Sequence, residues 1–282
     1  MKETRAEYLP ISKLHPFEGH PFKVTDNEEM EQLTWSILTQ GLLTPLVVRP
    51  LPNDEYEVIS GHRRLHACKK AGIETVPALI TDMDRDAAAI ALVDSNLHRE
   101  HILPSEKAFA YKLKLEAMNR QGQRTDLTSR QVGEKLSVTQ LSESSNESER
   151  QIHRYIRLTN LLPGILEKVD EGKIALTPAV ELSYLTEDEQ KNLLETMESE
   201  DCTPSLSQAI QMKQLSQAGK LNMDTIFGIL TQPKANQREK ISFRTDEVRK
   251  FFPKNYTPAQ MQEVILKLLG EYQRKRQRAQ ER

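Results

Sequence analysis

The chain has 282 residues, of which 37% are hydrophobic and 28% are charged, and its formal net charge is −2 at pH 7. This length predicts about two to three domains with enough chain to bury a core. No apolar run approaches the roughly 18 residues that cross a bilayer, and the first residues lack a signal-peptide pattern. We therefore expect a cytoplasmic protein without membrane contacts.

The distribution of charge limits how the chain could bind nucleic acid. Proteins that bind nucleic acid are often basic overall, whereas this chain is slightly acidic. Residues 241–282 hold 10 Lys and Arg against 5 Asp and Glu, a net charge of +5, which leaves −7 for residues 1–240. Any contact with DNA must therefore come from a local patch. The two cysteines, Cys68 and Cys202, form no CxxC pair, as expected in a reducing compartment.

The first 50 residues predict a strand, a loop, a helix and a second strand. A short apolar strand opens at Tyr8, and a loop rich in proline and histidine follows it. Asp26 is expected to cap a helix that Gly41 ends. The run Leu-Val-Val at residues 46–48 is then a buried strand.

The next stretch, residues 56–72, predicts a strand, a glycine turn and a helix that begins with two arginines. The helix carries an apolar stripe at three-residue steps and stops near Gly72. Two cations in a first turn cost about 0.3 to 1 kcal/mol each, because the free N–H groups already make that end positive. An anion held between Arg63 and Arg64 would reverse this cost, since guanidinium groups match phosphate oxygens. The alternative is two solvated arginines on a surface helix.

Residues 73–118 complete a small α/β domain. A strand at residues 73–81 precedes a nearly continuous apolar helix, residues 87–97, with Asp84 as its expected cap. Pro104 opens a further helix with apolar residues at helical spacing. The following segment is polar and contains Gly122, so we place the first domain at residues 1–120.

Residues 121–220 predict an all-helical domain with a helix-turn-helix. Helices are expected at residues 128–136, 138–145 and 148–161, and Asn146 suits a left-handed turn before the third. Arg150, Arg154 and Arg157 fall on one face of the third helix, opposite an apolar face. The alternative is an ordinary solvated face. The residues predicted to contact DNA are Ser148, Arg150, Gln151, Arg154 and Arg157.

The C-terminal part is predicted as a linker, residues 221–240, and a helical unit, residues 241–282. A helix at residues 258–272 has an apolar stripe with few local partners. A homodimer would bury this stripe, and packing onto the second domain is the alternative. The basic run at residues 274–278 is either a tail that contacts phosphates or a solvated charge run.

Three short stretches carry a resemblance to a known family. They are Gly-Leu-Leu-Thr-Pro-Leu-Val-Val-Arg at residues 41–49, Gly-His-Arg-Arg at 61–64, and Asn-Leu-His-Arg at 96–99. In this order they resemble the ParB family of DNA partition proteins, and the likeness covers roughly residues 7–200. It implies an α+β fold: a small α/β ParB/sulfiredoxin-like N-terminal domain, then an all-α helix-turn-helix domain and a helical C-terminal unit.

The resemblance also implies a nucleotide site that binds CTP with Mg²⁺. The first motif lies beside the base and ribose in the family, and the second and third hold the phosphates. Asn96 is the implied residue near the metal. The implied nucleotide-binding residues are Thr44, Pro45, Arg49, Gly61, His62, Arg63, Arg64, Asn96 and Arg99.

Two departures from the family pattern bear on chemistry. His62 and Ser95 stand where the family carries glutamates, and Glu18 stands near a family glutamine that is linked to hydrolysis. No catalytic residue is assigned, and at most weak CTP hydrolysis is expected. The spacing of His62 with His66, and of His98 with His101, would suit zinc. No cysteine or carboxylate pattern supports that reading.

The resemblance implies a sequence-specific DNA-binding partition protein of a plasmid or mobile element, with a CTP switch in its N-terminal domain. It would act as a homodimer on double-stranded DNA at the nucleoid, with or without a ParA-type partition ATPase. A ParB-like transcriptional regulator or nucleoid-occlusion factor is an alternative with the same motifs. A nucleotide-dependent enzyme on the same fold is a further alternative, although a sulfiredoxin would carry a cysteine at the position of Gly61.

Overall fold

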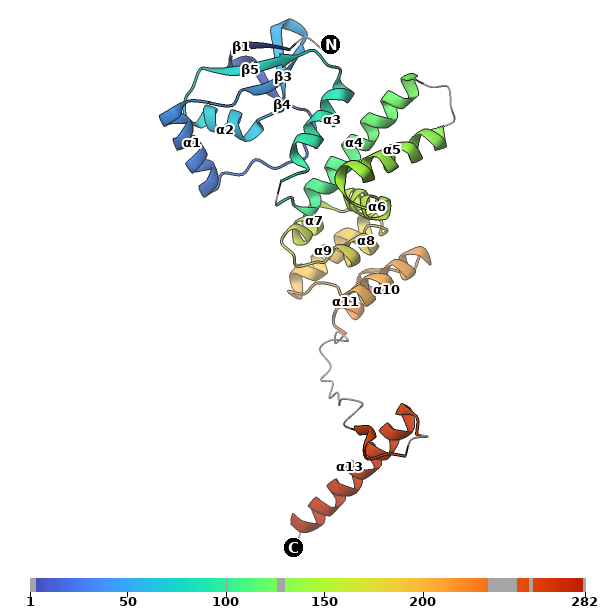
Figure 1. The fold of residues 1–282 in the computed structure, drawn as a ribbon. Helices are drawn as coiled ribbons and strands as arrows, with labels where there is room; N and C mark the ends of the chain where they lie inside the picture. Colours follow the sequence, from blue (N-terminus) through green and yellow to red (C-terminus); the bar gives the residue numbers. More distant parts are fainter. Residues whose placement is uncertain (1–3, 100, 126–129, 233–247, 254–255, 281–282) are drawn as a thin grey trace. The chain divides into compact units, whose positions relative to one another are not determined.

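The computed structural model describes residues 4–99, 101–125, 130–232, 248–253 and 256–280. The chain divides into two compact units, Met1–Gln232 and Pro233–Arg282, and each is described by itself (Figure 1). A five-stranded sheet lies in the N-terminal part, and helices make up most of the rest, which confirms the predicted α+β class. None of the described helices is long and apolar enough to cross a membrane.

The sheet has the strand order β1-β5-β3-β4-β2 and mixes parallel and antiparallel pairs. β3 and β4 form an antiparallel pair joined by a short 3-10 turn, which places the end of β4 beside the start of β3. The strands are β1 (Thr4–Pro10), β2 (Leu14–Pro16), β3 (Leu46–Leu51), β4 (Glu55–Ser60) and β5 (Thr75–Thr81).

Helices cover both faces of the sheet. Successive residues of a strand point to opposite faces, so neighbouring residues of β4 pack against different helices. Val58 packs into a core with α1 (Glu28–Gln40) and α2 (His62–Lys70). Ile59, the next residue of β4, packs instead with α3 (Arg85–Asn96). The end of β4 therefore lies between α2 on one side and α3 on the other.

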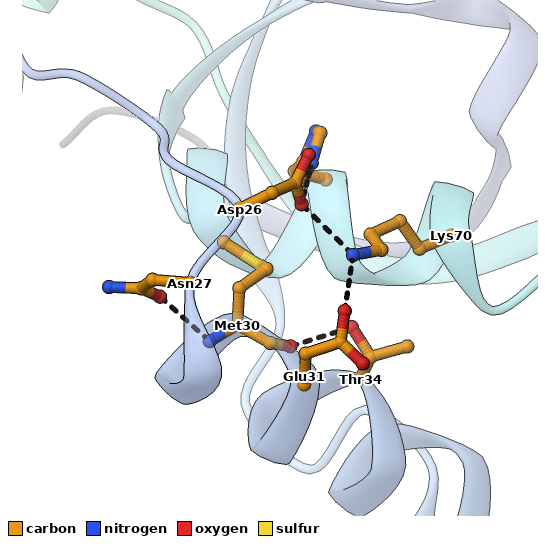
Figure 2. A network of polar contacts seen from close by, with 7 residues as sticks. Asp26, Asn27, Met30, Glu31, Thr34 and Lys70 are labelled. Carbon is orange, nitrogen blue, oxygen red and sulfur yellow. Dashed lines mark hydrogen bonds and ion pairs between the residues drawn. The ribbon is translucent and has the colours of Figure 1, made fainter.

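Polar contacts tie the start of α1 to the end of α2 (Figure 2). Asn27 caps α1 by accepting a hydrogen bond from the Met30 N–H at 3.0 Å, so the prediction of Asp26 as the cap was wrong by one residue. Asp26 instead accepts hydrogen bonds from Lys70 Nζ and His66 Nε2, both at 3.0 Å. These bonds fix α2 against α1 and so fix the turn from which α2 begins.

The predicted boundary after residue 120 falls inside one helix. α4 runs from Pro104 to Thr125, through Gly122, and packs against both α3 and the helices that follow it. A glycine inside a helix costs only about 1 kcal/mol, which the flanking helix-forming residues tolerate. α4 therefore belongs to the α/β part and to the helical part of the first unit.

The two short helices predicted at residues 128–136 and 138–145 are one helix, α5 (Arg130–Ser145), in the described part of this segment. Neither glycine nor proline interrupts residues 134–145, so nothing stops the helix there. The turn after α5 is as predicted, because Asn146 has a φ of +55°. α6 (Glu149–Arg157) follows, and a 3-10 turn (Leu158–Asn160) replaces the predicted last turn of this helix.

Five further helices complete the first unit around one core. They are α7 (Pro163–Asp170), α8 (Leu176–Leu182), α9 (Glu187–Ser199), α10 (Leu206–Gln217) and α11 (Met223–Leu230). The linker predicted for residues 221–240 is therefore wrong at its start: the side chain of Asn222 caps α11, and Ile226 and Ile229 are buried. Residues 233–240 of that prediction lie outside the described part of the chain.

The second unit contains α13 (Pro258–Gln280), which is longer than the predicted helix of residues 258–272. Met261 is buried, whereas Leu266, Leu268, Leu269 and Tyr272 are exposed. The apolar stripe predicted from the sequence is thus covered in its first part, since Val264 and Ile265 are also partly buried, and is exposed at Leu268 and Leu269. Most side chains of the basic run at residues 274–278 lie outside the described part of the structure.

Candidate nucleotide pocket and nucleic-acid interface

The turn between β4 and α2 depends on Gly61. Its φ is +105°, a left-handed conformation that side chains disfavour. A Cβ atom at this position would lie 2.6 Å from Leu46 Cδ2 and 3.1 Å from Arg64 Nη2. α2 begins at the next residue with no side-chain cap and no acidic residue in its first turn. The turn therefore presents backbone and two arginines at a helix end whose own first turn carries no acidic residue.

The second and third sequence motifs meet at one cavity of about 430 Å³. α1, the turn after β4, and the end of α3 each contribute to its wall. Among the residues that the structure describes, no aspartate or glutamate lines it. The lining residues are Leu33, Ser60, Gly61, His62, Arg63, Arg64, Ser95, Asn96 and Arg99.

The three arginines of the cavity are held in different ways. Arg63 donates to Glu29 at 2.9 Å in an exposed pair, which a stronger anion could replace. Arg64 Nη1 donates to the backbone oxygens of Thr44 at 2.6 Å and Pro45 at 2.9 Å. Arg99 lies over the Phe22 ring at 5.4 Å. Burial lowers the pKa of Arg99, and the nearby charge of Arg63 lowers this pKa further, so the two cations repel each other.

His62 has a structural role beside the arginines. Its Nε2 accepts a hydrogen bond from the Phe17 N–H at 3.3 Å, and its ring lies on the His20 ring with centroids 3.7 Å apart. Burial, together with the charges of His20 and Arg99, lowers the pKa of His62 to about 3. Burial likewise lowers the pKa of His20 to about 4. Both rings are therefore neutral at pH 7, and the positive charge of the cavity comes from arginine.

The first motif is placed beside the cavity rather than in its wall. Thr44 and Pro45 hold Arg64 through their backbone oxygens. Arg49 lies on β3 and donates from Nε to Glu57 Oε2 at 2.7 Å, with both side chains largely buried. Arg49 does not line the cavity. Since its charge is already balanced by Glu57, the structure favours a role in joining β3 to β4.

The described residues that line the cavity supply no carboxylate for Mg²⁺, which is usually bound through one or two carboxylates together with the phosphates of the substrate. Asn96 Nδ2 donates to the Leu92 backbone oxygen at 2.7 Å, and Ser95 Oγ donates to the same oxygen at 2.9 Å. The neighbouring carboxylate, Asp94, is paired with Lys114 at 2.5 Å. Among the residues that the structure describes, no cluster of three or more His, Cys, Asp and Glu could hold a metal ion.

Cys68 bears on the enzyme alternative. It is fully buried in α2, and burial raises the pKa of its thiol. A reactive cysteine needs solvent access and a lowered pKa, and Cys68 has neither. The cysteine that a sulfiredoxin would place before the histidine and arginine is here Gly61. The geometry therefore offers no thiol chemistry at the cavity.

The predicted recognition helix, α6, has the expected two faces. The Ser148 side chain caps it by accepting from the Gln151 N–H at 3.3 Å. Ile152 is buried against α4 and α5, with Tyr155 and Ile156 packed beside it. Arg150 is exposed on the opposite side. The helix thus has one face in the core and its basic face outward.

Two of the predicted DNA-binding arginines are tied to α8 and the residues after it. Arg154 donates to Gln151 Oε1 at 3.0 Å and to Thr177 Oγ1 at 2.6 Å. Arg157 donates to Ser183 Oγ and to the Ser183 backbone oxygen, each at 3.2 Å, and its guanidinium lies 3.9 Å from the centre of the Tyr184 ring. These contacts hold both side chains in place, whereas Arg150 remains available.

A second hollow, of about 530 Å³, lies along this basic face. No carboxylate of the described residues lines it either. Two of its lining residues were not predicted from the sequence: Lys112, which comes from α4, and His153, which lies three residues after Arg150. His153 could have been predicted from the helical spacing, because residues three apart lie on the same side of a helix. The lining residues are Lys112, Arg150, His153, Arg154, Ile156, Arg157, Thr159, Asn160, Val180 and Tyr184.

Comparison with known proteins places these features in a family. The ParB N-terminal domain matches residues 1–97. A protein of Vibrio cholerae named "Probable chromosome-partitioning protein ParB" is 30% identical over 252 residues, which cover 86% of this chain and 83% of the relative. A protein of Bacillus thuringiensis named "Nucleoid occlusion protein" is 31% identical over 225 residues, 77% of this chain and 75% of the relative.

Two crystal structures of C-terminally truncated ParB from Caulobacter crescentus are also similar. One is complexed to the centromeric parS site, with 21% identity, a TM-score of 0.41, and coverage of 75% of this chain and 99% of that one. The other is complexed with CTP-γ-S, with 24% identity, a TM-score of 0.32, and coverage of 68% and 98%. Scores this low assign no site. On the sequence matches, which span most of the chain and of its relatives, the chain belongs to the ParB family.

Proposed function

We propose that this protein binds a specific site on double-stranded DNA through α6 and binds CTP in the cavity at the β4–α2 turn, so that the nucleotide controls its hold on DNA. The observation that carries the proposal is the cavity itself. Two sequence motifs separated by about 30 residues bring Arg63, Arg64 and Arg99 together around a glycine turn, and no carboxylate of the described residues lies in the wall. Such a site is complementary to a chain of phosphates.

The residues of the cavity suggest how the nucleotide is held. Arg63 would exchange its exposed pair with Glu29 for a phosphate, and Arg64 is already aimed by its bonds to two carbonyl oxygens. Arg99 would close the phosphate site from the end of α3. Gly61 lets the phosphates approach the backbone. The choice of cytosine rests on membership of the ParB family, in which the stretch around Thr44 lies beside the base.

The DNA contact would be made by the basic hollow along α6. Arg150 is exposed and suited to a base edge or a phosphate, while Arg154 and Arg157 are held by neighbouring side chains. Lys112 and His153 extend the surface. Phosphate contacts place a protein on the duplex and base contacts give it sequence preference, so both kinds of residue are needed.

The protein would act as a homodimer at the nucleoid. Within the second unit, α13 leaves Leu266, Leu269 and Tyr272 exposed, and a second copy of this helix would cover them. A ParA-type ATPase as motor partner follows from the family alone. The proposal needs nucleotide binding and not hydrolysis, because a ligand that prefers one state is enough to switch a protein. Glu18, at the place linked to hydrolysis in the family, is paired with Arg85 at 2.8 Å.

Nucleoid occlusion is a second candidate role, favoured by the relatives that carry that name at 31% identity. The two roles predict different phenotypes in the host. Loss of a partition protein raises the rate at which a replicon is lost, whereas loss of an occlusion protein lets division septa form over DNA. Deleting the gene and scoring both separates the two.

The proposal is tested by measuring the release of the protein from DNA fragments that it selects in a pull-down from host DNA. CTP should change the dissociation rate from the selected fragment by at least about tenfold, and ATP and GTP should not. Arg63→Ala should abolish the CTP effect. Lys69→Ala, an exposed residue at the other end of α2, serves as the control and should behave as wild type. A CTP effect that survives in the Arg63→Ala protein would contradict the proposed site.

A further inference from the structure

Three described carboxylates near the nucleotide cavity are each paired with a cation of the protein, and a fourth, Glu106, lies near Arg99 and accepts hydrogen bonds from the backbone N–H groups of Lys23 and Leu103. Glu29 pairs with Arg63 at 2.9 Å, and Glu18 pairs with Arg85 at 2.8 Å. Asp94, which directly precedes Ser95 and Asn96 of the third motif, pairs with Lys114 at 2.5 Å. The Lys114 side chain is only 4% exposed, and Asp94 is the carboxylate that pairs with it. Asp94 is therefore poorly placed to become a metal ligand.

The two positions where the family pattern has glutamates carry no charge in this protein. His62 accepts the Phe17 N–H and lies on His20 as a neutral ring, so it is a buried structural group. Ser95 turns its hydroxyl back to the Leu92 backbone oxygen at 2.9 Å. Neither side chain supplies the anionic oxygen that would attract a divalent cation.

The electrostatics of the cavity also disfavour a divalent cation. Arg63, Arg64 and Arg99 line it without an acidic residue in the described part of the chain. The charge of Arg63 lowers the pKa of Arg99, and the nearby charge of Glu106 raises it by less. A divalent cation placed among these groups would add to the repulsion. A triphosphate without metal carries more negative charge than a magnesium triphosphate, and it therefore complements this wall better.

We infer that the cavity binds the triphosphate as a free anion, with no divalent cation held by the protein. The inference rests on the proposed function, since it concerns how the same site takes its nucleotide. Arg63, Arg64 and Arg99 would neutralise the charge of the triphosphate. In a site with acidic residues, a bound metal ion shares this task. Asn96 would serve as a neutral hydrogen-bonding group and not as a magnesium ligand.

The test is calorimetric titration of the full-length protein with CTP, once in buffer with excess Mg²⁺ and once in EDTA. The dissociation constant in EDTA should stay within about threefold of the value with Mg²⁺, a difference below 1 kcal/mol. A loss of affinity of about tenfold or more in EDTA would overturn the inference and leave the proposed function standing. Absence of binding in both buffers would overturn the proposed nucleotide site, and the inference with it.

A designed variant provides the converse experiment. Ser95→Glu restores a carboxylate at an exposed position of the cavity wall, and Ser95→Gln is its uncharged match. In Ser95→Glu, binding in EDTA should fall by about tenfold and Mg²⁺ should restore it, because the new carboxylate repels the free phosphates and attracts the metal. Ser95→Gln should bind alike in both buffers. Equal magnesium dependence in wild type and Ser95→Glu would contradict the inference.

Discussion

The nucleotide cavity and the basic hollow along α6 are both rich in arginine and, in the part of the chain that the structure describes, free of carboxylates, but they are built differently. At the cavity, a glycine turn places Arg63 and Arg64 at the start of α2, and two backbone carbonyls hold Arg64, while Arg99 comes from the end of α3. Along α6, Arg154 and Arg157 are placed by side chains of α8 and the residues after it. Backbone geometry therefore sets two of the three cavity arginines, whereas side-chain contacts between helices set the basic face of α6.

The difference suggests how the two regions respond to change. Where a cavity depends on backbone geometry, one substitution in the turn can abolish nucleotide binding. Where a surface is assembled from several helices, each substitution should remove only part of the affinity for DNA. Between the regions, Lys114 of α4 bonds both Asp94 of α3 and Ser144 of α5, at 2.5 and 2.9 Å. This buried lysine links the helix that ends in the nucleotide cavity to the helix that leads into α6.

The largest effect is expected at that link. Asp94→Ala leaves the Lys114 ammonium buried without its carboxylate and should lower the free energy of unfolding by about 3 kcal/mol. Lys114→Met should cost less, because Asp94 is 48% exposed and can be solvated. Urea denaturation of both variants measures the difference. A larger loss in Lys114→Met than in Asp94→Ala would show that the burial of the lysine does not decide the energetics.

The next largest effect is expected at the glycine turn. Gly61→Ala combines a left-handed φ with a Cβ that meets Leu46 at 2.6 Å, so stability should fall by about 2 kcal/mol and CTP binding should be lost. Gly72→Ala is the control, since its φ is +69° but no atom lies within 4 Å of the added Cβ. It should cost about 1 kcal/mol and leave CTP binding intact. Thermal unfolding and calorimetry separate the two, and normal CTP binding by Gly61→Ala would refute the turn as part of the site.

A smaller effect is expected along α6, where the arginines should not be equivalent. Arg150→Ala should weaken binding to the selected DNA by about 1 to 2 kcal/mol without lowering the melting temperature. Arg157→Ala should instead cost about 1 kcal/mol of stability, because its stacking on Tyr184 is lost, and should affect DNA binding less. Fluorescence anisotropy and thermal melting report both properties. Equal DNA losses with unchanged melting temperatures would contradict the distinction.

The smallest effect at neutral pH concerns the stacked rings of His20 and His62. Burial holds their pKa values at about 4 and about 3, below the ordinary value of 6.5. The unfolded chain therefore binds protons before the folded protein does, and stability should fall as pH decreases from 6.5 toward 4. Above pH 7 the pair should contribute no pH dependence. His20→Phe should flatten the fall between pH 6.5 and 4 in denaturation curves, and an unchanged slope would argue against the neutral pair.

The parts of the site that the sequence predicts are those encoded locally. Gly61 followed by two arginines, after a strand and before an apolar stripe, is enough to predict a turn that presents cations at a helix start. The same holds for Asn146 before α6, whose left-handed φ follows from the residue type. The meeting of Arg63 with Arg99 follows from the family resemblance, since no local pattern brings residues 36 positions apart together.

The parts that the sequence does not predict depend on packing between distant segments. Nothing local indicates that Arg49 bonds Glu57, that His20 lies on His62, or that Lys112 of α4 joins the surface of α6. The predicted domain boundary at residue 120 falls inside α4 for a related reason. A polar stretch with one glycine is typical of the end of a helix, but packing on both sides keeps α4 continuous through it.

The central claim is that Arg63 and its neighbours bind CTP at the β4–α2 turn, and calorimetric titration of wild type, Arg63→Ala and Lys69→Ala with CTP, ATP and GTP tests it most directly. The account predicts binding of CTP in preference to ATP and GTP by wild type and by Lys69→Ala. It predicts an affinity for CTP at least about tenfold lower in Arg63→Ala, with an unchanged melting temperature. Wild-type affinity for CTP in a folded Arg63→Ala protein would contradict the claim.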